Sequence, residues 1–142
     1  MSGKILTACA DIRVRFSEVD MMGVVWHGHY VKFFEDGREA FAREYQFSYL
    51  DAMNQGYSTP VVKMNINYKK SLRYNEPATI ETTFIDSEAA KIQYDYRIVA
   101  QKTGELITTG STMQVFVDRR GDLVLSSPAS FIQWKKKWGV QG

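Results

Sequence analysis

The sequence predicts an α+β fold in which one curved antiparallel sheet surrounds a single long helix. Two observations lead to this prediction. One segment near the N-terminus has a helical period, and almost everything after it alternates with the period of a strand, broken by short turns. A sheet with one apolar face has to bury that face, and this helix is the only sizeable element available to cover it. The 142 residues, 44% of them hydrophobic, are expected to form one domain over residues 1–142.

The first strand is predicted over residues 11–17, where polar and apolar residues alternate. Its inward-facing residues are expected to be Ile12, Val14 and Phe16. Cys9 precedes it and is the chain's one cysteine, so no internal disulfide can form and a cytoplasmic location is expected. We predict that Cys9 is a small buried residue rather than a nucleophile.

The helix is predicted from about residue 30 to residue 49. Apolar residues recur there at spacings of three, four and seven, namely Val31, Phe34, Phe41 and Tyr45. Gly37 lies inside the helix, where glycine costs about 1 kcal/mol relative to alanine. Close approach of a second backbone would explain it, because glycine has no side chain to hold the two apart.

The remaining chain predicts a meander of strands followed by a short helix. The expected strands cover residues 61–68, 78–86, 91–100, 105–118 and 123–125. Ser126, Ser127 and Pro128 would cap and open the final helix, which ends in W-K-K-K-W-G. The outer face and edges of such a sheet need covering, so a homo-oligomer is expected.

Composition and missing motifs exclude several classes of function. A formal charge of +2 is too close to neutral to indicate a nucleic-acid partner, and no apolar run approaches the roughly 20 residues of a membrane span. The sequence has no G-x-S-x-G elbow, no phosphate-binding glycine loop and no paired C-x-x-C motif. Any catalytic chemistry is therefore expected in the segment D-M-M-G-V-V-W-H-G-H-Y, residues 20–30.

This segment combines a carboxylate with the start of a helix. The first N–H groups of a helix lack partners within it, so the N–H groups of His27 and Gly28 could bind a carbonyl oxygen that becomes an oxyanion. Gly28 would also let a ligand approach the backbone closely. Asp20 is the carboxylate within reach, and it could act as a nucleophile or as a general base on water.

Simpler explanations exist for the same residues. Asp20 could be only a turn residue, and Trp26 could belong to the core or to an interface. His27 and His29 could be helix caps or surface groups, or could bind a metal together with Asp20 or Glu18. Because a zinc site uses three or four protein ligands and the chain has only two histidines, we expect no metal.

Residues 16–38, F-S-E-V-D-M-M-G-V-V-W-H-G-H-Y-V-K-F-F-E-D-G-R, resemble the signature of the 4-hydroxybenzoyl-CoA thioesterase family of hotdog-fold enzymes. The matching positions are Asp20, Gly23, Val24, Val25, His27 and Tyr30. Residues 68–82, Y-K-K-S-L-R-Y-N-E-P-A-T-I-E-T, resemble the strand and turn that follow the helix in this family. The chain departs from the pattern at His29, where many relatives have asparagine, and at Ser71, where the turn usually begins with proline.

The resemblance implies a hotdog fold and hydrolysis of an acyl-CoA thioester to a free acid and CoA, without a cofactor. Asp20 would be the nucleophile or base, and the N–H of His27 would polarise the thioester carbonyl. The expected substrate-binding residues are Gly28, Trp26, Tyr30, Lys69, Lys70 and Arg73, with the last three able to meet CoA phosphates. The family's sites lie at a dimer interface, so a homodimer or a tetramer built from dimers is expected.

Two other functions fit the same segment. The chain could be a thioesterase that acts on an acyl carrier protein, which would turn over free CoA esters weakly. It could also be a non-catalytic module that binds acyl-CoA without releasing thiol. The W-K-K-K-W tail is expected to be a solvated helix end rather than a membrane- or nucleic-acid-binding element.

Overall fold

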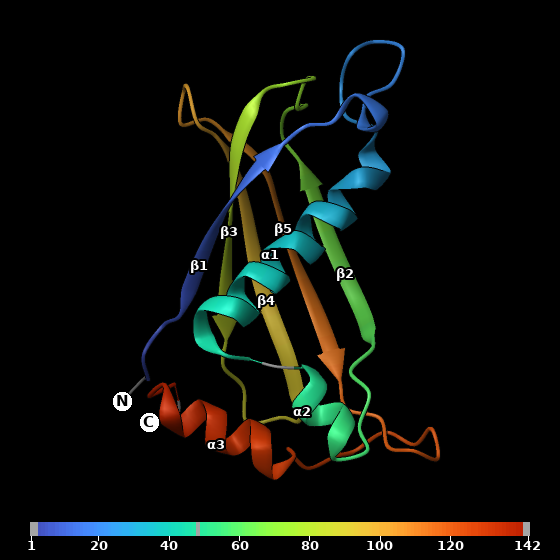
Figure 1. The fold of residues 1–142 in the computed structure, drawn as a ribbon, viewed down its shortest axis with the longest axis vertical. Helices are drawn as coiled ribbons and strands as arrows, with labels where there is room; N and C mark the ends of the chain where they lie inside the picture. The colour runs from blue at the N-terminus through green and yellow to red at the C-terminus, as the bar shows by residue number, and fades with distance from the viewer. Residues whose placement is uncertain (1–2, 48, 141–142) are drawn as a thin grey trace.

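The computed structural model describes residues 3–47 and 49–140, with the backbone alone for 49–51. Its strands are β1 (Thr7–Arg13), β2 (Val61–Tyr68), β3 (Pro77–Ile85), β4 (Lys91–Ala100) and β5 (Leu106–Val115). They form one antiparallel sheet in the order β1-β3-β4-β5-β2 (Figure 1). The predicted meander is therefore present in β3, β4 and β5, whereas β2 lies at the far edge of the sheet, beside β5.

A long helix crosses one face of this sheet diagonally (Figure 1). The helices are α1 (Tyr30–Tyr45), α2 (Tyr49–Asn54) and α3 (Ala129–Lys137), with 3₁₀ turns at Phe16–Glu18 and His27–His29. In Figure 1, α2 and α3 lie beyond the C-terminal end of α1. The predicted α+β architecture, a curved sheet around one long helix, is confirmed. None of the described helices is long and apolar enough to cross a membrane.

The core lies between α1 and the sheet. Phe34 stacks on Tyr96 of β4 with ring centroids 4.3 Å apart, and both side chains are buried. Gly37 lies over β3, where a Cβ atom would be 2.3 Å from the Thr82 Oγ1. The space at Gly37 is therefore filled by a close neighbour, but the predicted second backbone was wrong, because the group that approaches is the Thr82 side chain.

The helix ends earlier than predicted. Gln46 adopts a left-handed conformation with φ of 54° and follows the last residue of α1, Tyr45. The predicted end at residue 49 was therefore wrong. The Trp134 indole N–H donates a 2.8 Å hydrogen bond to the Tyr45 carbonyl, so α3 closes the core at this point.

Two predicted burials, of Phe16 and Cys9, were also wrong, and Val31 does not share the buried face of the helix with the other recurring apolar residues. Phe16 lies in a 3₁₀ turn after β1 and is 76% exposed, because the strand ends at Arg13 instead of continuing to residue 17. Val31 is 40% exposed, because α1 turns Phe33 toward the core in its place. Cys9 is exposed because it lies at an outward-facing position of β1.

The C-terminal region also differs in detail. The predicted strand at 123–125 is reduced to a single bridge between Val117 and Leu123. The N-cap of α3 is Pro128, and no side chain caps it, so the expected serine cap is absent from this helix. Pro128 fits here because the first turn of a helix does not need the N–H that proline lacks.

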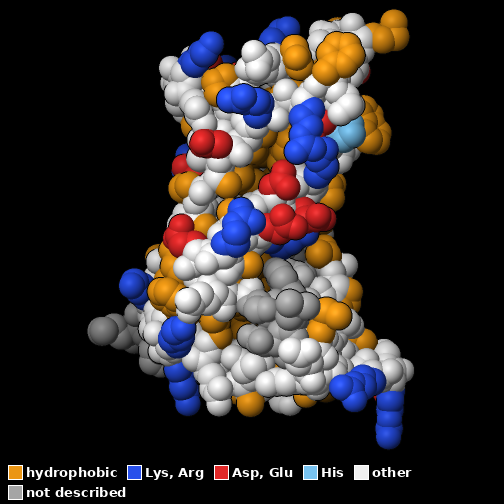
Figure 2. Space-filling view, viewed as in Figure 1, with side chains coloured by type: hydrophobic (Ala, Val, Ile, Leu, Met, Phe, Trp, Pro, Cys, Tyr) orange, Lys and Arg blue, Asp and Glu red, His pale blue; other side chains and the backbone are white. Residues whose placement is uncertain are grey.

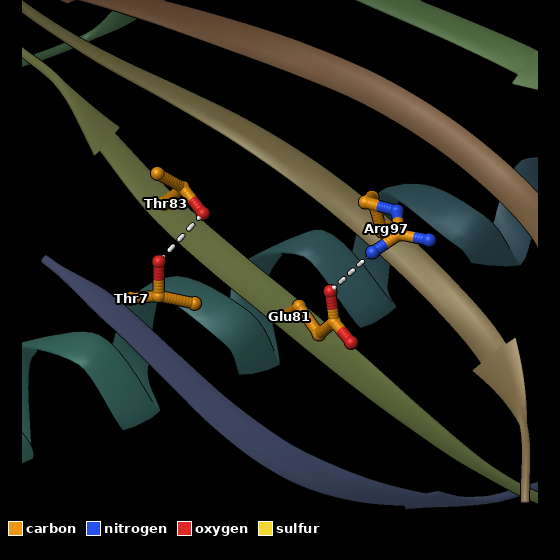
Figure 3. Close-up of polar contacts among 4 residues, drawn as sticks. All are labelled: Thr7, Glu81, Thr83 and Arg97. Carbon is orange, nitrogen blue, oxygen red and sulfur yellow. Dashed lines mark hydrogen bonds and ion pairs between the residues drawn. The ribbon is translucent and has the colours of Figure 1, made fainter. Parts of the chain in front are cut away.

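The outer face of the sheet is polar. Figure 3 shows the hydrogen bond between Thr7 of β1 and Thr83 of β3, whose hydroxyl oxygens lie 2.9 Å apart. It also shows Arg97 of β4 paired with Glu81 of β3 at 2.9 Å. Such a face does not need to be covered, so it gives no support to the expected oligomer. The edge strand β2, with Val61 and Val62 40% and 55% exposed, is the feature that still supports it.

Candidate active site

The connection from β1 to α1 folds into a small hairpin. Val19 and Val25 form an antiparallel bridge, and the Asp20 N–H donates a 2.8 Å hydrogen bond to the Val24 carbonyl. The tip turns at Gly23, whose φ is 78°, a value that favours glycine. Asp20 is thereby held at the tip of a short loop that returns directly to the start of α1.

One oxygen of Asp20 shapes this loop and the other does not. Asp20 Oδ1 accepts hydrogen bonds from the N–H groups of Met22 at 2.8 Å and Val24 at 3.4 Å. The turn role considered for Asp20 is therefore present. Its other oxygen, Oδ2, has no partner within the described residues, and the side chain is exposed. Asp20 can thus keep the loop in place while presenting one carboxylate oxygen to a ligand.

The start of the helix presents unpaired N–H groups. The 3₁₀ turn His27–His29 runs directly into α1, since the Tyr30 N–H bonds back to the His27 carbonyl. The His29 N–H bonds to the Trp26 carbonyl at 3.0 Å. Within residues 3–47 and 49–140, the N–H groups of His27 and Gly28 have no acceptor. Such groups, at the positive end of a helix dipole, are suited to binding an oxyanion.

Tyr68, the last residue of β2, holds this turn and was missed by the sequence analysis. Its hydroxyl donates a 2.9 Å hydrogen bond to the His27 carbonyl, and its ring lies edge-on to Tyr30. Tyr30 is buried, and its own hydroxyl accepts the Leu72 N–H at 3.2 Å. Burial raises the pKa of Tyr30, so the hydroxyl stays neutral. In the sequence, Tyr68 stands at the end of an alternating strand, ahead of two lysines, and begins the stretch 68–82 that resembles the family.

A cavity of about 230 Å³ opens beside this turn. It is lined by Val25, His27, Tyr30, Tyr68, Lys69, Lys70 and Ser71. Four of the predicted site residues therefore come together, namely His27, Tyr30, Lys69 and Lys70. The lining does not include Asp20, Trp26, Gly28 or Arg73.

The three basic residues expected near CoA phosphates do not lie together, because Lys69 and Lys70 line the cavity and Arg73 does not. Lys70 pairs with Glu105, and both side chains are about half exposed. The backbone N–H groups of Lys69 and Lys70 both donate to the Ile107 carbonyl at 3.0 Å. Arg73 forms a backbone bridge with Val24 and so contacts the Asp20 loop rather than the cavity.

Trp26 lies outside both the core and the cavity. It is 51% exposed, and its ring packs against those of His27 and His29. A Cβ atom at Gly28 would be 2.2 Å from this indole. The space that glycine leaves is therefore taken by Trp26, which gives Gly28 a packing role that its sequence position does not predict. In Figure 2, hydrophobic side chains gather at this end of the molecule, near a histidine.

Glu18 is the buried charged residue of this region, at 2% exposure. Burial acts to raise the pKa of its carboxyl, but the hydrogen bond and charge of Lys32 and the N–H of Arg15 outweigh it and hold the pKa below its usual value. Its carboxylate is therefore charged at neutral pH. Within the described residues, no three His, Cys, Asp or Glu side chains lie where they could hold a metal ion together.

The chain is similar to proteins named as thioesterases. Residues 14–135 match the family model described as the thioesterase-like superfamily. A protein of Bacillus subtilis (strain 168) named "Putative acyl-CoA thioesterase YneP" is 35% identical over 124 residues, which are 87% of this chain and 89% of that protein. "Acyl-CoA thioester hydrolase YbgC" of Escherichia coli O157:H7 is 30% identical over 75% of this chain and 79% of its own length.

Solved structures share the fold. The DHNA-CoA thioesterase of Staphylococcus aureus has a TM-score of 0.82 and 32% identity, covering 92% of this chain and 89% of its own. A 4-hydroxybenzoyl-CoA thioesterase has a TM-score of 0.77 over 90% of this chain and 97% of its own, but at 18% identity this likeness shows the fold alone. The chain is therefore an enzyme of the thioesterase-like superfamily and has the hotdog fold.

Proposed function

We propose that this enzyme hydrolyses acyl-CoA thioesters to a free acid and CoA at the start of α1. The observation that supports this most directly is the pair of unpaired N–H groups of His27 and Gly28 beside the cavity, on the loop that also carries Asp20. The names of the relatives support CoA esters as the substrate class.

In the proposed mechanism, the thioester carbonyl oxygen accepts the His27 N–H. As the carbonyl carbon becomes tetrahedral, negative charge develops on that oxygen, and the helix start stabilises it. The free oxygen of Asp20 either attacks the carbonyl carbon or removes a proton from the attacking water. If Asp20 attacks, the C–S bond breaks, CoA leaves as the thiolate, and water then hydrolyses the anhydride between Asp20 and the acyl group, which gives the free acid and restores the carboxylate. If Asp20 activates water, the water oxygen becomes part of the free acid as the C–S bond breaks, and the proton on Asp20 passes to the CoA thiolate.

We also propose that the active unit is a homodimer formed through the edge strand β2. An unpaired edge with exposed valines invites pairing with a second copy, and antiparallel pairing of identical edges closes a two-fold dimer. A lysine at Val62 should block this pairing. We expect light scattering to show a smaller species for Val62→Lys, and an unchanged mass would argue against β2 as the interface.

Thiol release from butyryl-, palmitoyl- and benzoyl-CoA tests the hydrolysis. We expect Asp20→Asn to lower kcat about 100-fold or more on every ester that the wild-type enzyme hydrolyses. Asp95→Asn is the matched control, because Asp95 is exposed on β4 away from the loop. Wild-type turnover by Asp20→Asn would remove Asp20 from the mechanism. Tight binding of the esters with no thiol release by the wild-type protein would instead favour a binding module.

A further inference from the structure

Glu18 is a buried carboxylate at the base of the Asp20 loop, and the proposed chemistry gives it no task. It is 2% exposed, whereas Asp20, two residues later, is exposed. A buried charge is costly unless it is paired and hydrogen-bonded. A well-packed apolar residue often serves stability equally well at such a position. The contacts that Glu18 makes are therefore informative about what it does.

The side chain of Glu18 joins two elements. Its Oε1 accepts the Arg15 N–H at 2.7 Å, at the point where the chain leaves β1. Its Oε2 lies 2.6 Å from the Lys32 Nζ, in the first turn of α1. The carboxylate thus ties the outgoing limb of the loop to the helix whose start carries the unpaired N–H groups.

The backbone of Glu18 holds the returning limb. Its carbonyl accepts the Trp26 N–H at 3.0 Å, next to the bridge between Val19 and Val25. Asp20 follows Glu18 by two residues, and His27 follows Trp26 directly. Both groups of the proposed reaction therefore extend from parts of the chain that this one residue holds, one on each limb.

We propose that Glu18 is a positioning residue that sets the Asp20 carboxylate relative to the His27 N–H, an inference that rests on the proposed function. It does not touch the substrate. Its two carboxylate bonds fix the base of the hairpin against α1, so that the free oxygen of Asp20 and the His27 N–H face the same thioester carbonyl. Small errors in such geometry slow the reaction strongly, since a misplacement of about 1 Å can lower the rate about 100-fold.

The test compares Glu18→Ala and Glu18→Gln with Glu88→Gln, an exposed glutamate in the β3–β4 turn. Thiol release from the ester that the wild-type enzyme hydrolyses fastest is measured well below each melting temperature. We expect kcat to fall about 10- to 100-fold in Glu18→Ala with KM within about 3-fold. Glu18→Gln should recover part of the loss, because its amide oxygen can still accept the Arg15 N–H. A purely structural role would lower the melting temperature and leave kcat of the folded enzyme unchanged.

A double variant separates positioning from an independent effect. If Glu18 acts through Asp20, adding Glu18→Gln to Asp20→Asn should lower kcat by less than about 2-fold further. If the losses in kcat from the two substitutions multiply in the double variant, the positioning role is wrong. It is also wrong if both Glu18 variants keep the kcat of the Glu88→Gln control while Asp20→Asn is inactive. Those results leave the proposed function intact. Wild-type turnover by Asp20→Asn overturns the proposed function, and this inference with it.

Discussion

The hydroxyl of Tyr68 donates a 2.9 Å hydrogen bond to the carbonyl of His27, across the gap between the end of β2 and the start of α1. This carbonyl belongs to the same peptide unit as the Gly28 N–H. Because a peptide unit is planar with its C=O and N–H opposed, fixing the carbonyl also fixes the direction of that N–H. Tyr68 therefore orients a donor of the proposed oxyanion site.

Removing this hydroxyl should slow the reaction more than it weakens substrate binding. We expect Tyr68→Phe to lower kcat about 3- to 10-fold, because a neutral hydrogen bond contributes about 0.5–1.5 kcal/mol. The ring contact with Tyr30 is kept in this variant. Steady-state thiol release is the measurement, and a change confined to KM would mean that Tyr68 contacts the substrate.

Replacing His27 separates the backbone from the imidazole. His27→Ala keeps the N–H and should retain kcat within a few-fold of the wild type. His27→Pro deletes the N–H and should lower kcat about 100-fold, the usual loss for one oxyanion donor. Proline fits this position, since it opens a helical turn and the preceding Trp26 has φ of −62° and ψ of 136°.

The melting temperatures of both His27 variants show whether the turn survives the replacement. Equal loss of kcat in His27→Ala and His27→Pro would assign the role to the imidazole instead of the backbone. A fully active His27→Pro would exclude the His27 N–H from the mechanism and leave that of Gly28 as the remaining donor.

The architecture was predictable because the period of the hydrophobic pattern reports which face of an element is buried. β2 and β4 begin and end where alternation predicted. The partner of β2 was not predictable, because pairing with β5 joins segments far apart in the chain and alternation says nothing about strand order. The end of α1 was not predicted because the residue that ends it, Gln46, adopts a left-handed conformation. No glycine or proline stands there to mark the end of the helix in the sequence.

The site was predictable to the extent that it is local. Asp20 and His27 belong to one short segment, and the sequence alone is enough to predict chemistry there, which stays a prediction. Tyr68 comes from a strand about 40 residues away, and its contact with His27 depends on how β2 pairs. Gly28 was assigned to ligand approach, whereas Trp26 fills the space, because local sequence does not tell which side chain folds over a glycine.

The contact between Gly37 and Thr82 predicts a stability effect that is independent of catalysis. An alanine methyl at position 37 would overlap Thr82 Oγ1 and lie 3.1 Å from Ile80 Cδ1. Overpacking costs about 1–3 kcal/mol, which exceeds the gain of about 1 kcal/mol from alanine in a helix. We expect Gly37→Ala to lower the free energy of unfolding by about 1 kcal/mol, measured by urea denaturation.

Thr82→Ala should relieve this conflict. Thr82 Oγ1 has no hydrogen-bond partner within the described residues, so its removal breaks no bond. In Gly37→Ala/Thr82→Ala, the helix gain of alanine should therefore appear, and the double variant should be more stable than Gly37→Ala alone. If the two substitutions instead lower the free energy of unfolding additively, the methyl group at position 37 overlaps a group other than Thr82.

The lowered pKa of Glu18 predicts how stability depends on pH. The unfolded carboxyl titrates near pH 4.3, and the folded one titrates below that value. The charged form is therefore favoured by folding, and its contribution is present above about pH 4.3 and is lost as the pH falls through the folded pKa. Urea unfolding of wild type and Glu18→Gln between pH 7 and pH 2.5 measures this contribution. Other carboxyl groups titrate in both proteins, so the difference in free energy isolates Glu18. It should be constant from pH 7 to about pH 5 and then fall, whereas a difference that stays constant down to pH 2.5 would mean that Lys32 and the Arg15 N–H do not favour the charged form.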